Sequence, residues 1–443
     1  MRGLKSTALL GLVLAGLVAY IYFYESKREP AAGTEAKKEK VFTIEQAKIG
    51  ALSIASSSGE STTLEKQGDR WKLLTPVATD ADEAEVSSVV SNISSLEMQR
   101  VVEEAAKDLK PYGLDPPRVD VGFKAEGDKE FRHLHIGDKT ATGGDLYARL
   151  ASDRRVFLIS GFLDSTFDRK TFDLRDKTVL KFERDKIDGV EVRTAQQTLR
   201  FVKADDAWRM MAPIEARADF GAVEGLIGRF NTGQMWAIAD AEPADLKKYG
   251  LEPPEYAVTL NAGSARSMIT IGTKTPEGTF YAKDAARPMV FTVESFLTDD
   301  LKKAPADYRP KDLFEFRSFS GTRFEVVRGS TSTVFEKHKG KDANAADTWV
   351  QTSPATKADE TKIVDFLSKF SNLRADSFVD SLPAGATDVA SVIARFGENK
   401  KEERVTFLKA GSDMFATRPG EPGAAKVLSS EFDDAVKLLD AVK

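Results

Sequence analysis

The stretch Trp71-Lys-Leu-Leu-Thr-Pro76 returns further along the chain as Trp208-Arg-Met-Met-Ala-Pro213. A second motif, Tyr112-Gly-Leu-Asp-Pro-Pro117, returns at the same offset as Tyr249-Gly-Leu-Glu-Pro-Pro254. One constant offset across two motifs of Trp, Tyr, Gly and Pro indicates that a structural unit was duplicated. The fold is therefore expected to consist of tandem copies of one module.

A third, diverged copy follows the first two. Trp349 and Pro354 keep the five-residue spacing of the Trp motif, and Val427 and Phe432 keep the gap seen in Phe157/Phe162 and Phe291/Phe296. The Tyr-Gly-Leu motif is missing, and the segment in its place, 382–388, is rich in Gly, Ala and Pro and predicts a loop. The copies divide the chain into an anchor, a linker and three repeat units: 1–24, 25–40, 41–181, 182–315 and 316–443.

Each module is expected to begin with a β-hairpin. Leu199–Lys203 alternates apolar and polar residues, as a half-buried strand does, and a polar turn at Ala204–Ala207 follows. The second strand then begins at the Trp, which faces the core, and the Pro five residues later closes that strand.

A helix is predicted after this hairpin in all three copies. Asp82, Asp219 and Asp359 each precede apolar residues spaced i, i+3, i+4 and i+7, which indicates one buried helix face. We interpret the three aspartates as helix N-caps rather than catalytic carboxylates, because a short acidic side chain satisfies the free N–H groups there. The apolar positions are Val86, Val89, Val90, Ile93 and Leu96; Phe220, Val223, Leu226, Ile227 and Phe230; and Ile363, Phe366, Leu367 and Phe370.

The Tyr-Gly-Leu motif then predicts a rigid corner that delivers Leu114 and Leu251 into the core, since Gly allows positive φ and the two prolines enforce extended backbone. A second hairpin, two more strands and a short helix near Phe162 or Phe296 complete the unit, and the third copy ends on a longer helix, Glu431–Val442. The fold class is α+β: a twisted antiparallel sheet with one helix on a face, used three times. The predicted strands are 119–123 with 131–136, 257–260 with 267–271, 146–148, 280–282, 156–159 and 290–293.

The amino terminus has the pattern of a membrane anchor. Arg2 and Lys5 precede the uncharged apolar segment Ala8–Tyr24, whose 17 residues would span roughly 25 Å as a helix. Bulky aromatics at 20–24 replace the small residues of a signal-peptidase site and favour a retained helix over a cleaved signal peptide. The expected topology is a single span in the bacterial inner membrane, with the amino terminus inside and the body exported to the periplasm.

The composition excludes several classes of function. The 443 residues carry a net charge of only −5 with interspersed signs, which argues against a nucleic-acid binder. Cysteine is absent, and this excludes disulfides, thiolate nucleophiles, Cys-ligated zinc and a lipid-modified amino-terminal cysteine. No nucleotide-binding, serine-hydrolase or zinc-protease motif occurs.

Two groups of residues are candidate sites, and neither is assigned. His133 and His135 would share one face of a strand and could approach one metal, but the preferred interpretation is a solvent-facing pair without a third ligand. The repeated tryptophans and Tyr112 and Tyr249 could stack on sugars, but their repetition in register favours core positions; the unrepeated Trp236 could be exposed. No catalytic, cofactor-binding or metal residue is predicted.

The anchor, the Trp-x-x-x-x-Pro motif and the Tyr-Gly-Leu-x-Pro-Pro motif together resemble the bacterial family of domain of unknown function 4340, over nearly all of 41–443. The missing third corner is a departure from that pattern. The resemblance implies a periplasmic accessory role beside an ABC-type export complex of the gliding-motility kind, with no catalytic residues to carry over.

Three functions follow as hypotheses. The leading one is a non-enzymatic envelope protein whose exported modules bind a protein partner, such as a transporter subunit. The alternative is a periplasmic binder of cell-wall or exported polysaccharide, and the third is an unrecognised hydrolase. A broad apolar patch would favour the protein partner, exposed aromatics in a groove the glycan, and converging carboxylates with shifted pKa values the enzyme.

Overall fold

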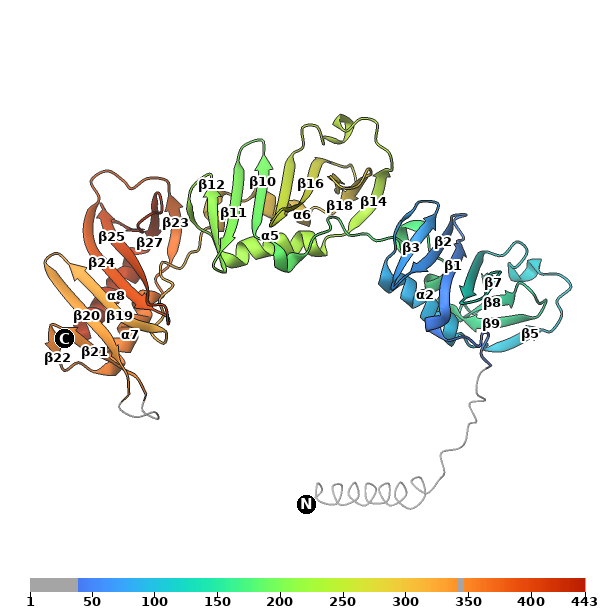
Figure 1. Ribbon diagram of the computed structural model, residues 1–443, viewed down its shortest axis with the longest axis horizontal. Coiled ribbons are helices and arrows are strands. Elements are labelled where there is room, and N and C mark those ends of the chain that lie inside the picture. The colour runs from blue at the N-terminus through green and yellow to red at the C-terminus, as the bar shows by residue number, and fades with distance from the viewer. Residues whose placement is uncertain (1–38, 341–345, 443) are drawn as a thin grey trace, which may run out of the picture. The chain divides into compact units, whose positions relative to one another are not determined.

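The computed structural model describes residues 39–340 and 346–442 (Figure 1). The chain divides into two compact units, one ending at Lys177 and the other beginning at Thr178. Within the described ranges no helix is both long and apolar enough to cross a membrane. The anchor predicted at 8–24 and the linker up to residue 38 lie outside the described residues.

Three nine-stranded antiparallel sheets form the body, and they share one strand order. The first runs β4-β3-β2-β1-β6-β7-β8-β9-β5, and the second and third repeat this order with β10–β18 and β19–β27. The third sheet keeps all nine strands although its sequence lacks the Tyr-Gly-Leu motif. The prediction of tandem antiparallel modules is therefore confirmed.

The strands of the first sheet are β1 (Ile49–Ala55), β2 (Ser61–Gln67), β3 (Arg70–Thr75), β4 (Thr79–Asp80), β5 (Arg100–Glu103), β6 (Val119–Ala125), β7 (Arg132–Lys139), β8 (Asp145–Leu150) and β9 (Val156–Ser160). Those of the second are β10 (Gly189–Thr194), β11 (Thr198–Ala204), β12 (Ala207–Ala212), β13 (Ala216–Arg217), β14 (Met235–Asp240), β15 (Tyr256–Ala262), β16 (Ala265–Lys274), β17 (Phe280–Asp284) and β18 (Val290–Val293). Those of the third are β19 (Gly321–Arg328), β20 (Thr331–His338), β21 (Thr348–Ser353), β22 (Ala355–Thr356), β23 (Ala375–Val379), β24 (Thr387–Phe396), β25 (Lys401–Ala410), β26 (Asp413–Thr417) and β27 (Ala424–Val427).

The predicted hairpins are present. Val119 pairs with Ile136 and Phe123 with Arg132 in the first module, and Tyr256 pairs with Ile271 in the second. The turn before Trp208 is tight because Asp205 and Asp206 both adopt positive φ, as a two-residue turn with right-handed strand twist requires. The remaining predicted strands are also present, as β8, β9, β17 and β18.

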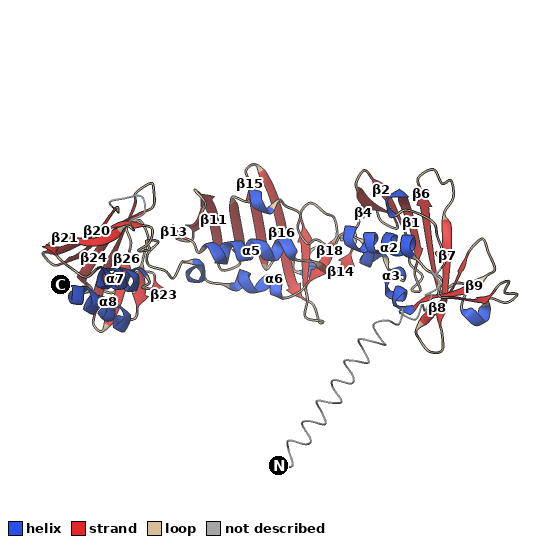
Figure 2. Ribbon diagram, turned by 90° about the horizontal axis from the view of Figure 1, so that it is seen from below, coloured by secondary structure: helices blue, strands red, loops and turns tan. Residues whose placement is uncertain are grey.

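A helix crosses a face of each sheet (Figure 2): α2 (Glu83–Ser95), α5 (Phe220–Thr232) and α7 (Glu360–Ser371), and in the third module the carboxy-terminal helix packs in the same core as α7. The N-cap assignment is confirmed. Asp82 accepts hydrogen bonds from the backbone N–H of Ala84 and Glu85, at 3.1 and 3.2 Å. Asp219 accepts one from Ala222 at 2.8 Å, and Asp359 accepts one from Thr361 at 2.9 Å.

The predicted apolar stripes are buried with one exception. Phe220, assigned to the core-facing stripe of α5, is 53% exposed. It is the first residue of the helix, so its side chain lies beyond the turn that covers the sheet, beside Lys203. Short helices end the first two modules: α3 (Asp164–Phe167) and α4 (Thr171–Leu174) in the first, and α6 (Phe296–Asp299) in the second. The longer helix α8 (Ser429–Val442) ends the third module.

The three repeated tryptophans are core residues. Trp71, Trp208 and Trp349 are 5%, 2% and 3% exposed. Each lies on the second strand of its hairpin, β3, β12 or β21. The proline five residues later follows the end of that strand in every module, and its peptide bond is cis.

The Tyr-Gly-Leu corner differs from its prediction. Gly113 and Gly250 have the expected positive φ, 64° and 66°. Leu114 and Leu251 are buried, but they belong to small clusters that include the corner tyrosine and a buried strand residue, Val156 or Val290. The cluster of Leu114 is separate from the main core of the first module. The first proline of each pair is cis. The corner thus covers a second apolar patch of the sheet instead of feeding the main core.

The segments that join modules add to the module that follows. The Val179 N–H donates to the Gly233 carbonyl at 3.2 Å, and the Leu313 N–H donates to the Leu373 carbonyl at 3.1 Å. Leu313 and Phe314 lie in the core of the third module, although the sequence division placed them at the end of the second.

Candidate functional site

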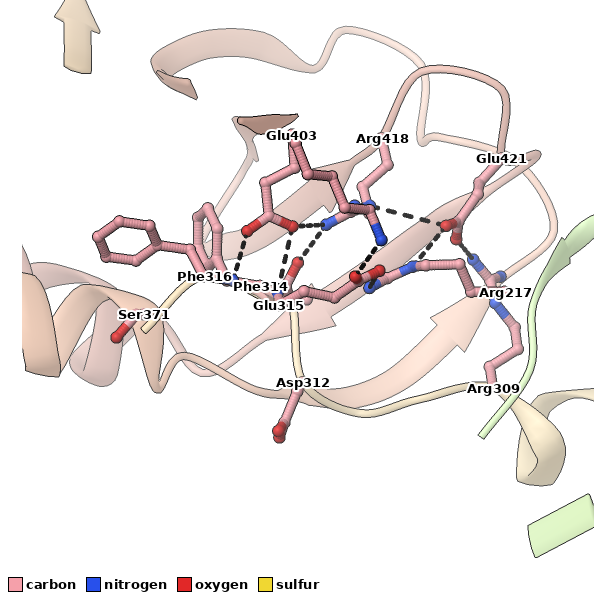
Figure 3. A network of polar contacts seen from close by, with 12 residues as sticks. Arg217, Arg309, Asp312, Phe314, Glu315, Phe316, Ser371, Glu403, Arg418 and Glu421 are labelled. Atoms are coloured by element: carbon pink, nitrogen blue, oxygen red, sulfur yellow. Dashed lines mark hydrogen bonds and ion pairs between the residues drawn. The ribbon is translucent and has the colours of Figure 1, made fainter. Parts of the chain in front are cut away.

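A network of charged side chains joins residues of the second and third modules within the second unit (Figure 3). Arg217 ends β13, Arg309 follows the short helix η8 (Pro305–Tyr308), and Glu421 lies in the loop between β26 and β27. Arg217 Nε lies 2.7 Å from one oxygen of Glu421, and Arg309 Nη2 lies 3.2 Å from the other. One carboxylate of the third module therefore binds two guanidinium groups of the second.

This part of the network is largely desolvated. The side chains of Arg217, Arg309 and Glu421 are 17%, 7% and 10% exposed. The Arg309 guanidinium carbon lies 4.2 Å from the ring centroid of Phe378 in β23. Burial lowers the pKa of Arg309, while the charge and hydrogen bond of Glu421 oppose that shift. An arginine remains protonated even so, and the pair stays ionic.

The other half of the network holds the segment between the modules. The Glu403 carboxylate, which is 2% exposed, accepts hydrogen bonds from the backbone N–H of Phe316 at 2.7 Å and Glu315 at 3.1 Å. Arg418 donates both to Glu403, at 2.9 Å, and to the Leu313 carbonyl, at 2.6 Å. Each buried polar group in this half therefore has a partner, as stable burial of charge requires.

Glu315 connects the two halves. Its carboxylate lies 2.5 Å from Lys401 Nζ and 3.7 Å from Arg217 Nη1. Burial alone would raise the pKa of Glu315, but the hydrogen bond and charge of Lys401, with the charges of Arg217 and Arg418, outweigh it and lower the pKa. Every acid in the network is paired with a base, and the arrangement supports a structural clamp between modules.

The histidine pair of the first module lies on one face of β7, as predicted from the strand period. The ring centroids of His133 and His135 are 6.5 Å apart, and His133 Nδ1 lies 2.9 Å from Asp120 on the neighbouring strand β6. The pair is not simply solvent-facing, because the side chains are only 33% and 16% exposed. Burial lowers the pKa of His135. Within the described residues no group of three or more His, Asp or Glu side chains is arranged to hold a metal ion.

The aromatic candidates separate into two kinds. The repeated tryptophans are buried, so they offer no platform for a sugar. The repeated tyrosines fasten the last strand of the sheet: Tyr112 donates to Glu103 on β5 at 2.9 Å, and Tyr249 donates to Asp240 on β14 at 2.6 Å. Trp236, also on β14, is 60% exposed, as the sequence indicated it could be.

Sequence reasoning missed the charged network, and little in the sequence could have revealed it. Its members are single residues among 64 basic and 69 acidic ones. One signal exists: Arg287-Pro288 and Glu421-Pro422 occupy matching turns, just before β18 in the second module and β27 in the third. Arg287 donates to the carbonyls of Thr178 and Val179 at 2.8 and 2.7 Å, whereas the acidic Glu421 binds the arginines of the preceding module.

These features define a protein built of tandem α+β modules. The family model for a domain of unknown function (DUF4340) matches residues 71–209 and 208–392, and the chain belongs to this family. Each match runs from the Trp motif of one module to that of the next or beyond, so the family unit spans parts of two sheets. A search of curated proteins finds no match.

Proposed function

We propose that this protein is a non-enzymatic, membrane-anchored component of the cell envelope whose exported modules bind a protein partner. The observation that carries the proposal is a pair of equivalent exposed apolar side chains. Leu74 in β3 is 41% exposed, and Met211, at the equivalent position of β12, is 36% exposed. Val77, just beyond β3, is 43% exposed and extends the first of these surfaces.

Single exposed apolar residues are ordinary on protein surfaces, so exposure alone carries no weight. Here the exposed side chains recur at the same place in two modules, three residues after the buried tryptophan on the same strand. The third module has the polar Thr352 at this position. Apolar surface kept in register but uncovered is the property expected of a partner-binding surface, because covering it is favourable by about 25 cal/mol per Å².

The amino-terminal segment supports a partner at the membrane. With residues 8–24 as the anchor, the linker at 25–40 would reach about 50 Å when fully extended, which keeps the first module near the bilayer. An ABC-type exporter subunit fits this placement and agrees with the expectation drawn from the family resemblance.

Site-specific photo-crosslinking in native membranes tests the proposal. A photoreactive amino acid is placed at Leu74 or Met211, with exposed Lys129 in the β6–β7 turn and Thr352 as controls. We expect Leu74 and Met211 to give adducts with the same membrane protein, identified by mass spectrometry, and the controls to give none. Equal labelling at all four positions, or no protein adduct from the first two, would refute the proposal.

The polysaccharide alternative rests on Trp236, whose exposed indole on the last strand of the second sheet could stack on a sugar. Cosedimentation with purified cell-wall glycan distinguishes the two functions. If the partner is a protein, only background binding to the glycan is expected, and Trp236→Ala leaves it unchanged. If the protein binds glycan, the wild type cosediments with the glycan and Trp236→Ala does not.

A further inference from the structure

The first module has a cleft beside its core tryptophan. In the other two modules the indole N–H of the equivalent tryptophan has a hydrogen-bond acceptor. The cleft has a volume of about 280 Å³, and Trp71, Lys66, Ser87, Gln46 and Val90 are among its lining residues. It lies between β3, helix α2 and the turn η2 (Gln46–Lys48). Each of these elements has a direct counterpart in the second module, so the two sites can be compared residue by residue.

In the second module a glutamate fills the corresponding place. Glu224 on α5 accepts a hydrogen bond from Trp208 Nε1 at 3.0 Å. The same carboxylate lies 3.6 Å from Arg184 and 3.7 Å from Lys203. The indole N–H is thus satisfied by a carboxylate, which is itself held by two cations.

In the third module a backbone carbonyl takes the place of that carboxylate. Trp349 Nε1 donates to the Ser318 carbonyl at 3.1 Å, and Lys337 donates to that carbonyl at 3.2 Å and to the Phe319 carbonyl at 2.7 Å. The lysine is common to all three modules as Lys66, Lys203 and Lys337, each paired across the hairpin with the Trp.

The first module keeps the donors and lacks the acceptor. Ser87 stands five residues after the N-cap Asp82, where Glu224 stands five after Asp219, and Gln46 replaces Arg184 at the start of the turn. Among the residues that the structure describes, none accepts a hydrogen bond from Trp71 Nε1 and none forms an ion pair with Lys66. An indole N–H, an ammonium group and a hydroxyl therefore line an open cleft with apolar walls.

We propose that this cleft binds the carboxylate of an acidic side chain, glutamate or aspartate, presented by a protein partner. Trp71 Nε1 and Lys66 donate to the carboxylate oxygens, Ser87 supplies a hydroxyl, and Ile49 and Val90 pack against the methylene groups. The site of Glu224 in the second module is the template for this contact. That the occupant belongs to a protein rests on the proposed function. The cleft adds the chemistry by which that protein partner would be recognised.

The test uses the full chain in detergent, labelled with 5-fluorotryptophan and observed by fluorine NMR. The four tryptophans give four resonances, and Trp71→Phe identifies that of Trp71. N-acetylglutamate N-methylamide is the probe, and the matching glutamine amide is the uncharged control. We expect the acid alone to shift the Trp71 resonance saturably, in the millimolar range appropriate to one side chain, while the other three resonances stay fixed.

Two variants complete the test. Lys66→Ala is expected to weaken binding of the probe about tenfold, as the loss of a charge-assisted hydrogen bond implies. Ser87→Glu places the second module's acceptor in the cleft, so it should shift the Trp71 resonance without probe and abolish further shifts. An unmoved Trp71 resonance, an equal response to the glutamine probe, or undiminished binding by Lys66→Ala overturns the proposal. Crosslinking from Leu74 reports on the partner independently, so a negative titration with that crosslink intact rejects the cleft alone.

Discussion

At the scale of single residues, repetition in this chain identifies structural roles. The three aspartates that align across modules all cap helices, and the three aligned tryptophans are all buried. The helix residue beside the tryptophan varies, because it is Ser87 in one module and Glu224 in the next. Function is therefore more reasonably sought where the copies differ, or where they expose the same apolar side chain, than among the repeated polar residues.

The caps give the simplest prediction. Asp219→Ala removes the acceptor of the Ala222 N–H and should lower the free energy of unfolding by about 0.5–2 kcal/mol. Asp219→Asn, which also caps well, should be nearly neutral in chemical denaturation. A folded Asp219→Asn protein that has lost its cellular function would indicate a catalytic carboxylate instead.

Trp208 should behave as a core residue with one polar partner. Trp208→Ala is expected to cost about 3–5 kcal/mol and to leave Glu224 without its indole donor. Trp236→Ala, at an exposed position, serves as the control and should leave thermal unfolding nearly unchanged. An unaltered melting curve for Trp208→Ala would show that the core assignment is wrong.

At the scale of elements, the repeated motifs predicted the hairpins and helices because those depend on local spacing and capping. The prediction that the Tyr-Gly-Leu corner packs into the main core was wrong, because the corner packs on a strand residue further along the chain. Tyr249 and Gly250 lie against β16 at Gly272, where an added Cβ would be 2.1 Å from the Tyr249 carbonyl oxygen. The sequence repeats this glycine as Gly137 in the first module, where an added Cβ would be 2.0 Å from the Tyr112 carbonyl oxygen. The repetition indicates a structural role, but local spacing does not show that the glycine packs against the corner.

Gly272→Ala should therefore push the corner away from the sheet. The expected loss is about 1–3 kcal/mol in the free energy of unfolding, the usual cost of overpacking. Gly225→Ala is the matched control, because an added Cβ there meets nothing within 4 Å and alanine favours the helix, so stability should rise by about 0.5–1 kcal/mol. Equal effects of the two substitutions in thermal unfolding would contradict the close packing of the corner.

At the scale of the whole molecule, ion pairs join residues that are distant in the chain. These pairs could not be predicted from the sequence. Arg217 and Glu421 are 204 positions apart, and no periodicity links them. Glu403 and Arg418 of the third module bind the segment that connects it to the second module. Glu421 of the third module binds two arginines of the second module. Pairing of this kind follows from tertiary structure and lies beyond local sequence patterns.

Acid should weaken this clamp. The pKa of Glu315 is lower in the folded protein than its ordinary value of about 4.3, so its ionised form stabilises the fold above that pH. That contribution is lost as the pH falls through the lower folded-state value. The difference in free energy of unfolding between the wild type and Glu315→Gln should be largest at neutral pH and shrink as the pH falls below the ordinary glutamate pKa of about 4.3. A difference that grows on acidification would contradict the ion pairing.

We propose above all that the modules present a protein-binding surface. The most direct measurement is the yield of partner recovered with the full-length protein from native membranes after lysine crosslinking. The double variant Leu74→Asp/Met211→Asp is compared with Thr352→Asp, which places the same charge at the equivalent position of the third module. We predict that the double variant loses the partner, that Thr352→Asp keeps it, and that both melt within a few degrees of the wild type. Full recovery of the partner by the folded double variant would contradict the account.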